Sequence, residues 1–401
     1  MSAHAAPVRP AGPPFVAALA RFASESWLAV AIAAAITAIC FGATEGIETT
    51  DGIGLVPNTV LQMSLTIAAG VLVAAAALLR ARGAGRLWGV GSAAALFALA
   101  IYTAFSLIWS IDPANSWIEA NRTFAYAATF AGGVAAVRLI GHRWRSVIAG
   151  VLLATVAVSL YALASKVFPA SLDLADPYAR ISQPFGYWNA VGVTAALGIV
   201  PCLWLGARRE GHGVVNALAA PALCALIVTL MLSYSRGALI AAVVGAALWF
   251  VLVPLRLRAL AVLAVGGLAA APVVIWTYRQ PLLTDDHVVI GSRTFWGHRL
   301  GLILVAALIA AFVAAVLVRF AAERWPLSGP ARRRIGIAVL VALALVPFAA
   351  LGALAHSQRG LGGSISHAWN TLTNPHATQP STNPGRLVNA SNDHALYWSY
   401  A

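Results

Sequence analysis

Long hydrophobic runs recur along most of this sequence, from Trp27 to His356. A helix needs about 20 apolar residues to cross the roughly 30 Å hydrocarbon core of a bilayer, and most runs have about that length. The run 214–253 is about twice too long for one span, so it must fold back at its polar stretch, Ser233 to Gly237. The pattern predicts an all-α fold, a polytopic membrane bundle of about eleven transmembrane helices. The predicted spans are 27–43, 58–80, 87–110, 121–140, 145–167, 188–206, 214–234, 237–253, 258–277, 299–320 and 335–356.

Arginine clusters occupy every second loop between these spans, and acidic residues lie in the intervening loops. Positive charge in short loops stays on the cytoplasmic side. The alternation therefore predicts a cytoplasmic N-terminus and, with an odd number of spans, an extracytoplasmic C-terminus. We expect a multi-pass protein of the inner (cytoplasmic) membrane, in contact with membrane lipids and with its active face outside. The arginine clusters are Arg80, Arg82 and Arg86; Arg138, Arg143 and Arg145; Arg208 and Arg209; Arg256 and Arg258; and Arg324 with Arg332, Arg333 and Arg334.

Three regions differ in composition. Residues 1–26 begin with several prolines and predict a disordered cytoplasmic tail, and residues 27–356 form the predicted transmembrane bundle. Residues 357–401 are rich in Gly, Ser, Asn, Thr and Pro, and predict an extracytoplasmic loop. The last residues, Tyr397 to Ala401, resemble the start of an element, so we expect this loop to be incomplete.

Composition agrees with a membrane as the solvent, since 60% of residues are hydrophobic and only 10% are charged. The formal net charge is +13, and Lys166 is the only lysine. So basic a chain could bind nucleic acid. Orientation in the membrane already explains where the arginines lie, so we expect no nucleic-acid partner. Acidic residues are absent from the middle of the spans, which weighs against a proton- or ion-coupled transporter.

Two arginines on the predicted outer face stand in distinctive surroundings. Arg180 precedes the sixth span, and Arg236 follows the tight turn at Ser233 to Ser235. Ser235 could cap the next helix, whose free amides would favour an anion. A guanidinium beside such a helix start could bind phosphate or pyrophosphate through two oxygens at once. Alternatively, Arg236 could simply reach toward lipid headgroups.

These residues carry a resemblance to a known family. The stretch Ser233 to Ala238 resembles the Ser-x-Ser-Arg-Gly signature of the O-antigen ligase and O-antigen polymerase superfamily. The stretch Arg180 to Asn189 is similar to that family's Arg-x-x-x-x-Phe-Gly-x-x-Asn motif. Further similarities are Trp109 to Pro113 followed by Arg122, and the stretch from Asn389 to Tyr397 and Trp398. The resemblance covers about residues 100–401.

The resemblance implies a glycosyltransferase that needs neither a metal nor another cofactor. Its partners would be a polyprenyl-pyrophosphate-linked glycan and an acceptor glycan, lipid or protein. Arg180 and Arg236 would be catalytic, because they would hold the pyrophosphate and stabilise charge on the leaving group. The family's histidine base would lie beyond Ala401, and His394 does not stand in its context. The implied substrate-binding residues are Arg122, Gln183, Tyr187, Asn189, Ser233, Ser235 and Arg386.

Other functions remain open. A polysaccharide polymerase of the same superfamily would differ only in its acceptor, whereas a lipid-linked glycan exporter would line a central path with polar residues. A membrane protein without activity is a third possibility. Asp173 with Asp176, and Asp285 with Asp286 and His287, could be divalent-metal ligands of a nucleotide-sugar transferase. Nucleotide sugars are absent outside the cell and short acidic loops are usually solvated, so we expect no metal site.

Overall fold

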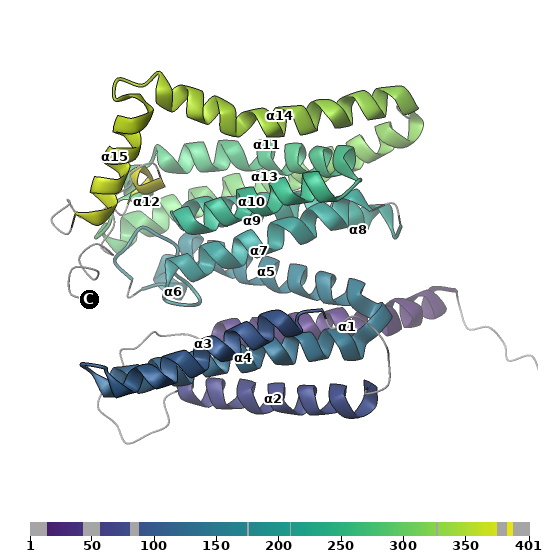
Figure 1. Cartoon of the computed structure of the whole chain (residues 1–401). Coiled ribbons are helices and arrows are strands. Elements are labelled where there is room, and N and C mark those ends of the chain that lie inside the picture. Colours follow the sequence, from purple (N-terminus) through teal and green to yellow (C-terminus); the bar gives the residue numbers. More distant parts are fainter. Residues whose placement is uncertain are drawn as a thin grey trace, which may run out of the picture. The chain divides into compact units, whose positions relative to one another are not determined.

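The computed structural model describes residues 14–42, 57–80, 88–174, 176–208, 210–325, 328–374 and 383–387. These residues form α-helices, short 3-10 helices and turns, and no β-strand occurs among them. Contacts within the chain divide it into two compact units (Figure 1). Unit 1 comprises residues 1–43 and 47–153, and unit 2 comprises residues 44–46 and 154–401.

Unit 1 is a group of helices in which α4 packs against both α2 and α3. Its elements are α1 (Pro14–Gly42), α2 (Pro57–Arg80), α3 (Val90–Phe105), η1 (Ser106–Ile108), α4 (Pro113–Ile140), η2 (Gly141–Arg143) and the first part of α5 (Trp144–Val167). Helix α4 begins where Asp112 accepts a hydrogen bond from the backbone N–H of Asn115 at 3.2 Å. A Cβ atom at Gly132 would lie 2.8 Å from the Cα of Ala69, so glycine permits the close contact between α4 and α2.

Unit 2 has helix α9 at its centre, packed against α7, α11 and α13. Its elements are the rest of α5, α6 (Pro169–Leu172), α7 (Trp188–Ala207), α8 (Gly213–Ala217), α9 (Ala219–Leu232), α10 (Arg236–Leu252), α11 (Arg256–Tyr278), α12 (Pro281–Thr284), α13 (Ile290–Arg324), α14 (Gly329–Ala355), α15 (Gly360–Thr373) and η3 (Pro384–Leu387). Buried apolar residues from six helices form one core, for example Leu163, Val191, Val228, Val273 and Leu300. This core fixes the relative positions of the helix ends within unit 2.

The helices account for all the predicted hydrophobic runs. Of the described helices, eight are long and apolar enough to cross a membrane: Thr59–Leu79, Val90–Ile108, Pro113–Ile140, Trp144–Val167, Trp188–Ala207, Gly213–Leu232, Arg256–Tyr278 and Ile290–Arg324. Two further apolar helices, Ser26–Gly42 and Arg236–Leu252, are shorter. Their length and composition indicate an all-helical, multi-pass membrane protein.

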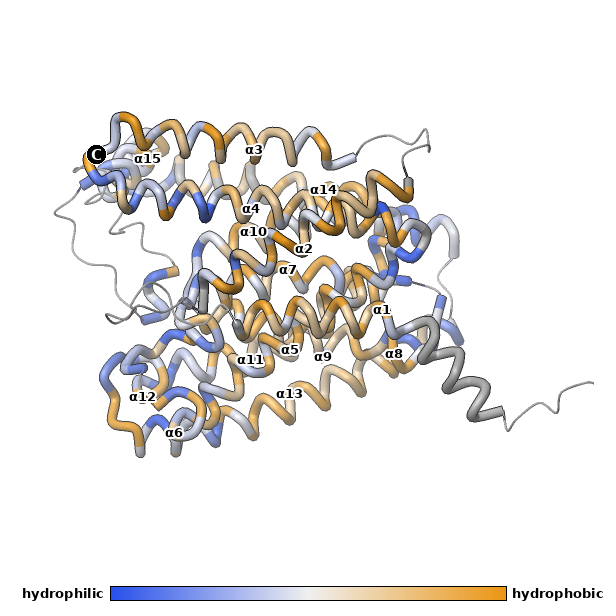
Figure 2. Tube along the Cα trace, turned by 90° about the horizontal axis from the view of Figure 1, so that it is seen from below, coloured by the Kyte–Doolittle hydropathy of each residue, from blue (hydrophilic) through white to orange (hydrophobic). Residues whose placement is uncertain are grey.

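Hydrophilic residues of unit 2 gather at two ends, with hydrophobic helices between them (Figure 2). One end carries α6, α12 and α15, and is called here the α12 end (Figure 1). The opposite end carries α8 and is called the α8 end. Helix α13 connects the two, because it packs against α6 and α12 and also against α8. Such a distribution is expected when a membrane surrounds the middle of a bundle.

The structure corrects the predicted boundaries. Helix α1 begins at Pro14, so residues 14–26 are helical rather than a disordered tail, and residues 1–13 lie outside the described residues. Helix α13 starts nine residues before the predicted 299–320, because its first turns are polar and escape a hydropathy criterion. The loop predicted for 357–401 contains helix α15, and its residues 375–382 and 388–401, which include Asn389, His394, Tyr397 and Trp398, are not described.

The contact between α7 and the α9–α10 turn yields a test of the packing. A Cβ atom at Gly192 would lie 2.6 Å from Ser233 Oγ and 2.9 Å from Ser235 Cβ, so a side chain there must displace the turn. We expect Gly192→Ala to destabilise the protein by about 1–3 kcal/mol, measured as a lower unfolding temperature in detergent. Gly267→Ala is the control, because nothing lies within 4 Å of that position. Equal unfolding temperatures for the two variants would contradict the close contact.

Candidate functional site

Arg180 lies in the loop between α6 and α7, at the α12 end of unit 2, and is only 1% exposed. Its Nε donates a hydrogen bond to the carbonyl oxygen of Ser233 at 3.0 Å, and its Nη2 lies 3.5 Å from Oδ1 of Asn189. The guanidinium carbon is 4.3 Å from the centre of the Trp188 ring. Nη1 is buried and has no hydrogen-bond partner among the described residues. One donor of this buried guanidinium is therefore left without a partner.

The turn between α9 and α10 folds back as the sequence predicts. Helix α9 ends at Leu232 and α10 begins at Arg236, so the prediction of a reversal at 233–237 is confirmed. The backbone of Tyr234 has a φ of 49°, in the left-handed region that aromatic residues seldom adopt. Ser235 is the N-cap of α10 and accepts a hydrogen bond from the N–H of Ala238 at 3.4 Å. Helix α10 thus begins directly after this tight turn, with Arg236 as its first residue.

A cavity of about 300 Å³ opens at this turn. It is lined by Asn189, Val193, Tyr234, Ser235, Arg236, Gly237, Ala238 and Arg386. Two arginines, from α10 and η3, therefore share one cavity with the start of a helix. Guanidinium groups bind phosphate and carboxylate oxygens in pairs, and the free amides of a helix start also favour negative charge. The lining suits an anion.

Electrostatics around Arg180 point to the same kind of ligand. The pKa of Arg180 is lowered to about 9, first by burial and then by the positive charges of Arg386 and Arg236. An anion between these groups would offset their mutual repulsion and raise the pKa of Arg180 again. Burial also raises the pKa of the Tyr234 hydroxyl, which therefore stays protonated and can act as a donor. The site therefore combines hydrogen-bond donors with a net positive charge.

Most of the residues predicted from the sequence lie at this site. Asn189, Ser235, Arg236 and Arg386 line the cavity. The carbonyl of Ser233 accepts from Arg180, as described above. The hydroxyl of Tyr187 accepts a hydrogen bond from Nδ2 of Asn189 at 2.7 Å, which orients this amide. The start of α7, the α9–α10 turn and η3 are thus brought together around one cavity.

Two predicted residues have other surroundings. Gln183 donates from Nε2 to Oδ1 of Asp173 at 3.1 Å, so it belongs to a polar network rather than to the cavity lining. Arg122 lies on α4 in unit 1, where it forms an ion pair with Glu119 at 2.5 Å. Substrate binding was predicted for Gln183 and Arg122 only because they lie in or near the family motifs. Neither residue lines the cavity.

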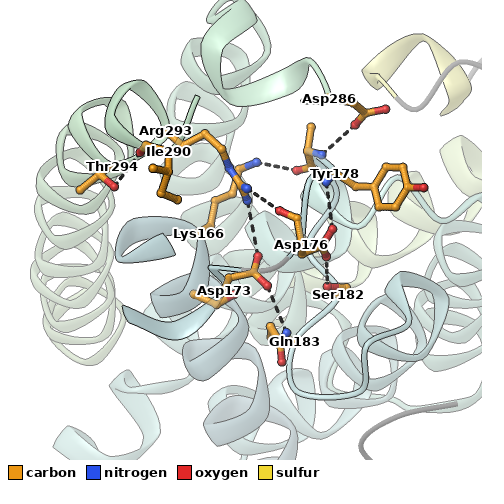
Figure 3. Close-up of polar contacts among 12 residues, drawn as sticks. Lys166, Asp173, Asp176, Tyr178, Ser182, Gln183, Asp286, Ile290, Arg293 and Thr294 are labelled. Carbon is orange, nitrogen blue, oxygen red and sulfur yellow. Dashed lines mark hydrogen bonds and ion pairs between the residues drawn. The ribbon is translucent and has the colours of Figure 1, made fainter. Parts of the chain in front are cut away.

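A buried ionic network that was not expected from the sequence lies at the α12 end (Figure 3). Lys166, Asp173 and Arg293 are 6%, 7% and 8% exposed, whereas the short acidic loops were expected to be solvated. Nη2 of Arg293 lies 3.6 Å from Oδ2 of Asp173. One signal could have revealed the network: a single lysine, in a chain that otherwise uses arginine, stands at the end of an apolar helix.

The acidic residues considered as metal ligands have protein partners instead. Oδ1 of Asp286 accepts a hydrogen bond from the N–H of Ala179 at 2.8 Å, and Oδ2 of Asp176 accepts from the Ser182 hydroxyl at 2.6 Å. Within the described part of the chain, no group of three or more His, Cys, Asp or Glu residues is arranged to hold a metal ion. These carboxylates therefore act as hydrogen-bond acceptors for the α6–α7 loop.

Comparisons of this chain with models of known protein families, with curated proteins and with solved structures found no match. The resemblance to O-antigen ligases and polymerases thus stays a prediction from short motifs. A functional interpretation has to rest on the geometry of the cavity and on the charges around it.

The buried carboxyl of Asp173 predicts an unusual pH dependence of stability. Burial is the main cause that raises the pKa of Asp173 to about 6, from an ordinary 3.8. Between these pH values the folded state binds more protons than the unfolded state, so the contribution of this group to stability falls as the pH rises. We expect wild type to gain about 2 °C or more in unfolding temperature relative to Asp173→Asn when the pH falls from about 7 to about 5. A difference between the two proteins that does not change with pH would contradict the raised pKa.

Proposed function

We propose that this protein is a membrane glycosyltransferase of the O-antigen ligase kind. It transfers a glycan from polyprenyl pyrophosphate to an acceptor glycan, lipid or protein outside the cytoplasmic membrane, without a metal. The observation that carries the proposal is the meeting of three cationic side chains at one cavity: Arg236 and Arg386 line it, and Arg180 is held beside it. A polymerase of the same superfamily would use the same site with a different acceptor.

The chemistry of the reaction explains why such a cavity would accelerate it. When the bond between the sugar and the pyrophosphate breaks, negative charge builds up on the leaving phosphate. Cations that are already fixed in position stabilise this charge without any reorganisation at the moment of reaction. Arg180 meets that condition, because its Nε is held by the Ser233 carbonyl and its plane lies against Trp188. Arg180 does not line the cavity, so its charge would act on the phosphate from beside Arg236 and Arg386.

The acceptor reaction requires a further group. The attacking hydroxyl must lose a proton, and a positioned base contributes typically 10²–10⁴-fold to such a step. The resemblance implies a histidine for this role, and the proposal assigns it to none of the described histidines. The cavity residues are assigned to the donor substrate, and the arginines act on the leaving group.

Orientation follows from the distribution of charge in unit 2. Acidic residues, among them Asp173, Asp176 and Asp286, lie at the α12 end with the cavity, and arginines lie in the connections at the α8 end. These arginines are Arg208, Arg256, Arg258, Arg324, Arg332, Arg333 and Arg334. By the positive-inside rule the α8 end is cytoplasmic and the cavity faces outward. We propose eleven spans, with the N-terminus inside, by adding Ser26–Gly42, α10 and α14 to the eight long apolar helices.

Substitution of the two predicted catalytic arginines tests the proposed reaction. We expect Arg180→Ala and Arg236→Ala in the full-length protein each to lower glycan transfer at least about 10²-fold, because each removes a fixed positive charge near the leaving group. The measurement is transfer from a polyprenyl-pyrophosphate-linked glycan to an acceptor in proteoliposomes. Arg279→Ala, which removes an exposed arginine at the end of α11, should transfer at the wild-type rate. Wild-type transfer by either site variant would refute the role of that arginine.

The orientation has its own test in intact cells. In a variant whose three cysteines are replaced by alanine, one new cysteine is introduced at Asp285 or at Glu210, both of which are exposed. A maleimide that does not cross membranes should label Asp285→Cys directly and Glu210→Cys only after permeabilisation, because the two lie at opposite ends of unit 2. The reverse pattern would place the cavity in the cytoplasm, where the proposed reaction does not occur.

A further inference from the structure

The α12 end contains more buried charge than the cavity explains. Lys166 closes α5, Asp173 follows α6 and Arg293 lies in the first turns of α13, and each is less than a tenth exposed. Removing charged groups from water is costly, and apolar residues of similar size often stabilise a protein as well or better. Packing alone therefore does not account for these three residues. The hydrogen-bond partners of this network indicate its structural role.

Two side chains bind the backbone of a single residue in the α6–α7 loop (Figure 3). Nζ of Lys166 donates to the carbonyl oxygen of Ala179 at 2.5 Å, and Oδ1 of Asp286 accepts from the N–H of the same residue at 2.8 Å. Both polar backbone atoms of Ala179 are thus bound by side chains. Ala179 is the residue directly before Arg180.

The rest of the loop is fixed in the same manner. Asp176 accepts from the N–H of Tyr178 at 2.9 Å through Oδ1 and from the Ser182 hydroxyl at 2.6 Å through Oδ2. Arg293 donates from Nη1 to the carbonyl oxygen of Asp176. The loop on both sides of Arg180 is therefore held by side chains, Asp176 of the loop itself and Arg293 of α13, rather than by a regular helix or strand.

We propose that Lys166 and Asp286 are positioning residues for Arg180. A side chain leaves the backbone in a direction set by its own peptide groups. The two bonds fix both peptide groups of Ala179, one of which joins it to Arg180, and so direct the guanidinium of Arg180. With Ala179 held, Nε reaches the carbonyl of Ser233 at 3.0 Å and the guanidinium stacks on Trp188. The catalytic consequence of this arrangement rests on the proposed function, whereas the arrangement itself does not.

Matched variants separate this role from general stabilisation. Asp286→Asn keeps an oxygen that accepts from Ala179 and removes the charge, and Asp286→Ala removes both. Asp285→Ala removes the same charge one residue away, at an exposed position. Lys166→Met keeps an unbranched chain of similar length and removes the donor. A positioning role requires that Asp286→Asn behaves like wild type and that Asp286→Ala does not.

The experiment measures the exposure of Arg180 directly. The full-length protein in lipid bilayers is treated with an arginine-selective dicarbonyl reagent, and mass spectrometry follows the modification of each arginine. Exposed Arg279 serves as the standard for reagent activity, and buried Arg293 reports general loosening. In wild type, Asp286→Asn and Asp285→Ala, Arg180 should react slowly. In Asp286→Ala and Lys166→Met it should react roughly tenfold faster, as expected when one hydrogen bond is lost, while Arg293 in Asp286→Ala stays protected.

Three results would overturn the inference. The first is that Arg180 reacts as slowly in Asp286→Ala and Lys166→Met as it does in wild type. The second is that Arg180 reacts at the same rate in Asp286→Asn and Asp286→Ala. The third is that the reaction rates of Arg180 and Arg293 rise together in Asp286→Ala. Glycan transfer by the same variants tests the proposed function separately. If Arg180 is released and transfer is unchanged, the positioning role stands and the role of Arg180 in transfer fails.

Discussion

One buried guanidinium joins two segments that lie 53 residues apart in the chain: Arg180 donates to the carbonyl of Ser233. A cation that is removed from water must recover its lost hydration from protein partners, and here it finds a backbone oxygen, an amide and an aromatic ring. Each partner fixes the position of another element. The carbonyl belongs to the α9–α10 turn, and both Asn189 and Trp188 belong to the first turn of α7. The start of α7 and the α9–α10 turn, which both contribute to the cavity lining, are thus held around one charge.

Small residues make this convergence possible. Helix α7 comes so close to the α9–α10 turn that Gly192 faces Ser233 and Ser235 with no space for a methyl group. Membrane helices lack a strong hydrophobic drive toward one another, so tight packing of small residues contributes much of their association. The same is true further along α7, where Gly198 faces Thr155 and Leu226. Packing in the apolar middle of unit 2 thereby determines how closely the polar groups meet at the α12 end.

The linear pattern predicted some features well and others poorly. Run lengths located the helices, because a bilayer imposes a minimum length on each apolar segment. The reversal at Ser233 to Ser235 was evident, since it is the one polar stretch in a run too long for one span. Arg180, Arg236 and Arg386 were singled out by short motifs and by the chemistry of a helix start, and the structure brings them near one cavity.

The buried network was missed for a physical reason. Lys166, Asp173 and Arg293 find their partners across long sequence distances, and hydropathy carries no information about such pairs. The partner of Gln183 could not be predicted for the same reason, because its bond to Asp173 depends on where α6 ends. Helix α15 was missed because it is short and amphipathic: Leu361, Ile365 and Trp369 share one exposed face, spaced four residues apart. A search for hydrophobic runs long enough to cross a membrane does not detect residues spaced in this way.

Lys166 also has a practical consequence. It is the only lysine side chain in the sequence, and the folded protein encloses its amine under the α6–α7 loop. Reagents that attack amines, such as active esters used for fluorescent tagging, surface immobilisation or chemical cross-linking, will therefore find no lysine on the surface of the folded chain. Reaction of that single amine would instead be a signal that the loop has come away from the bundle.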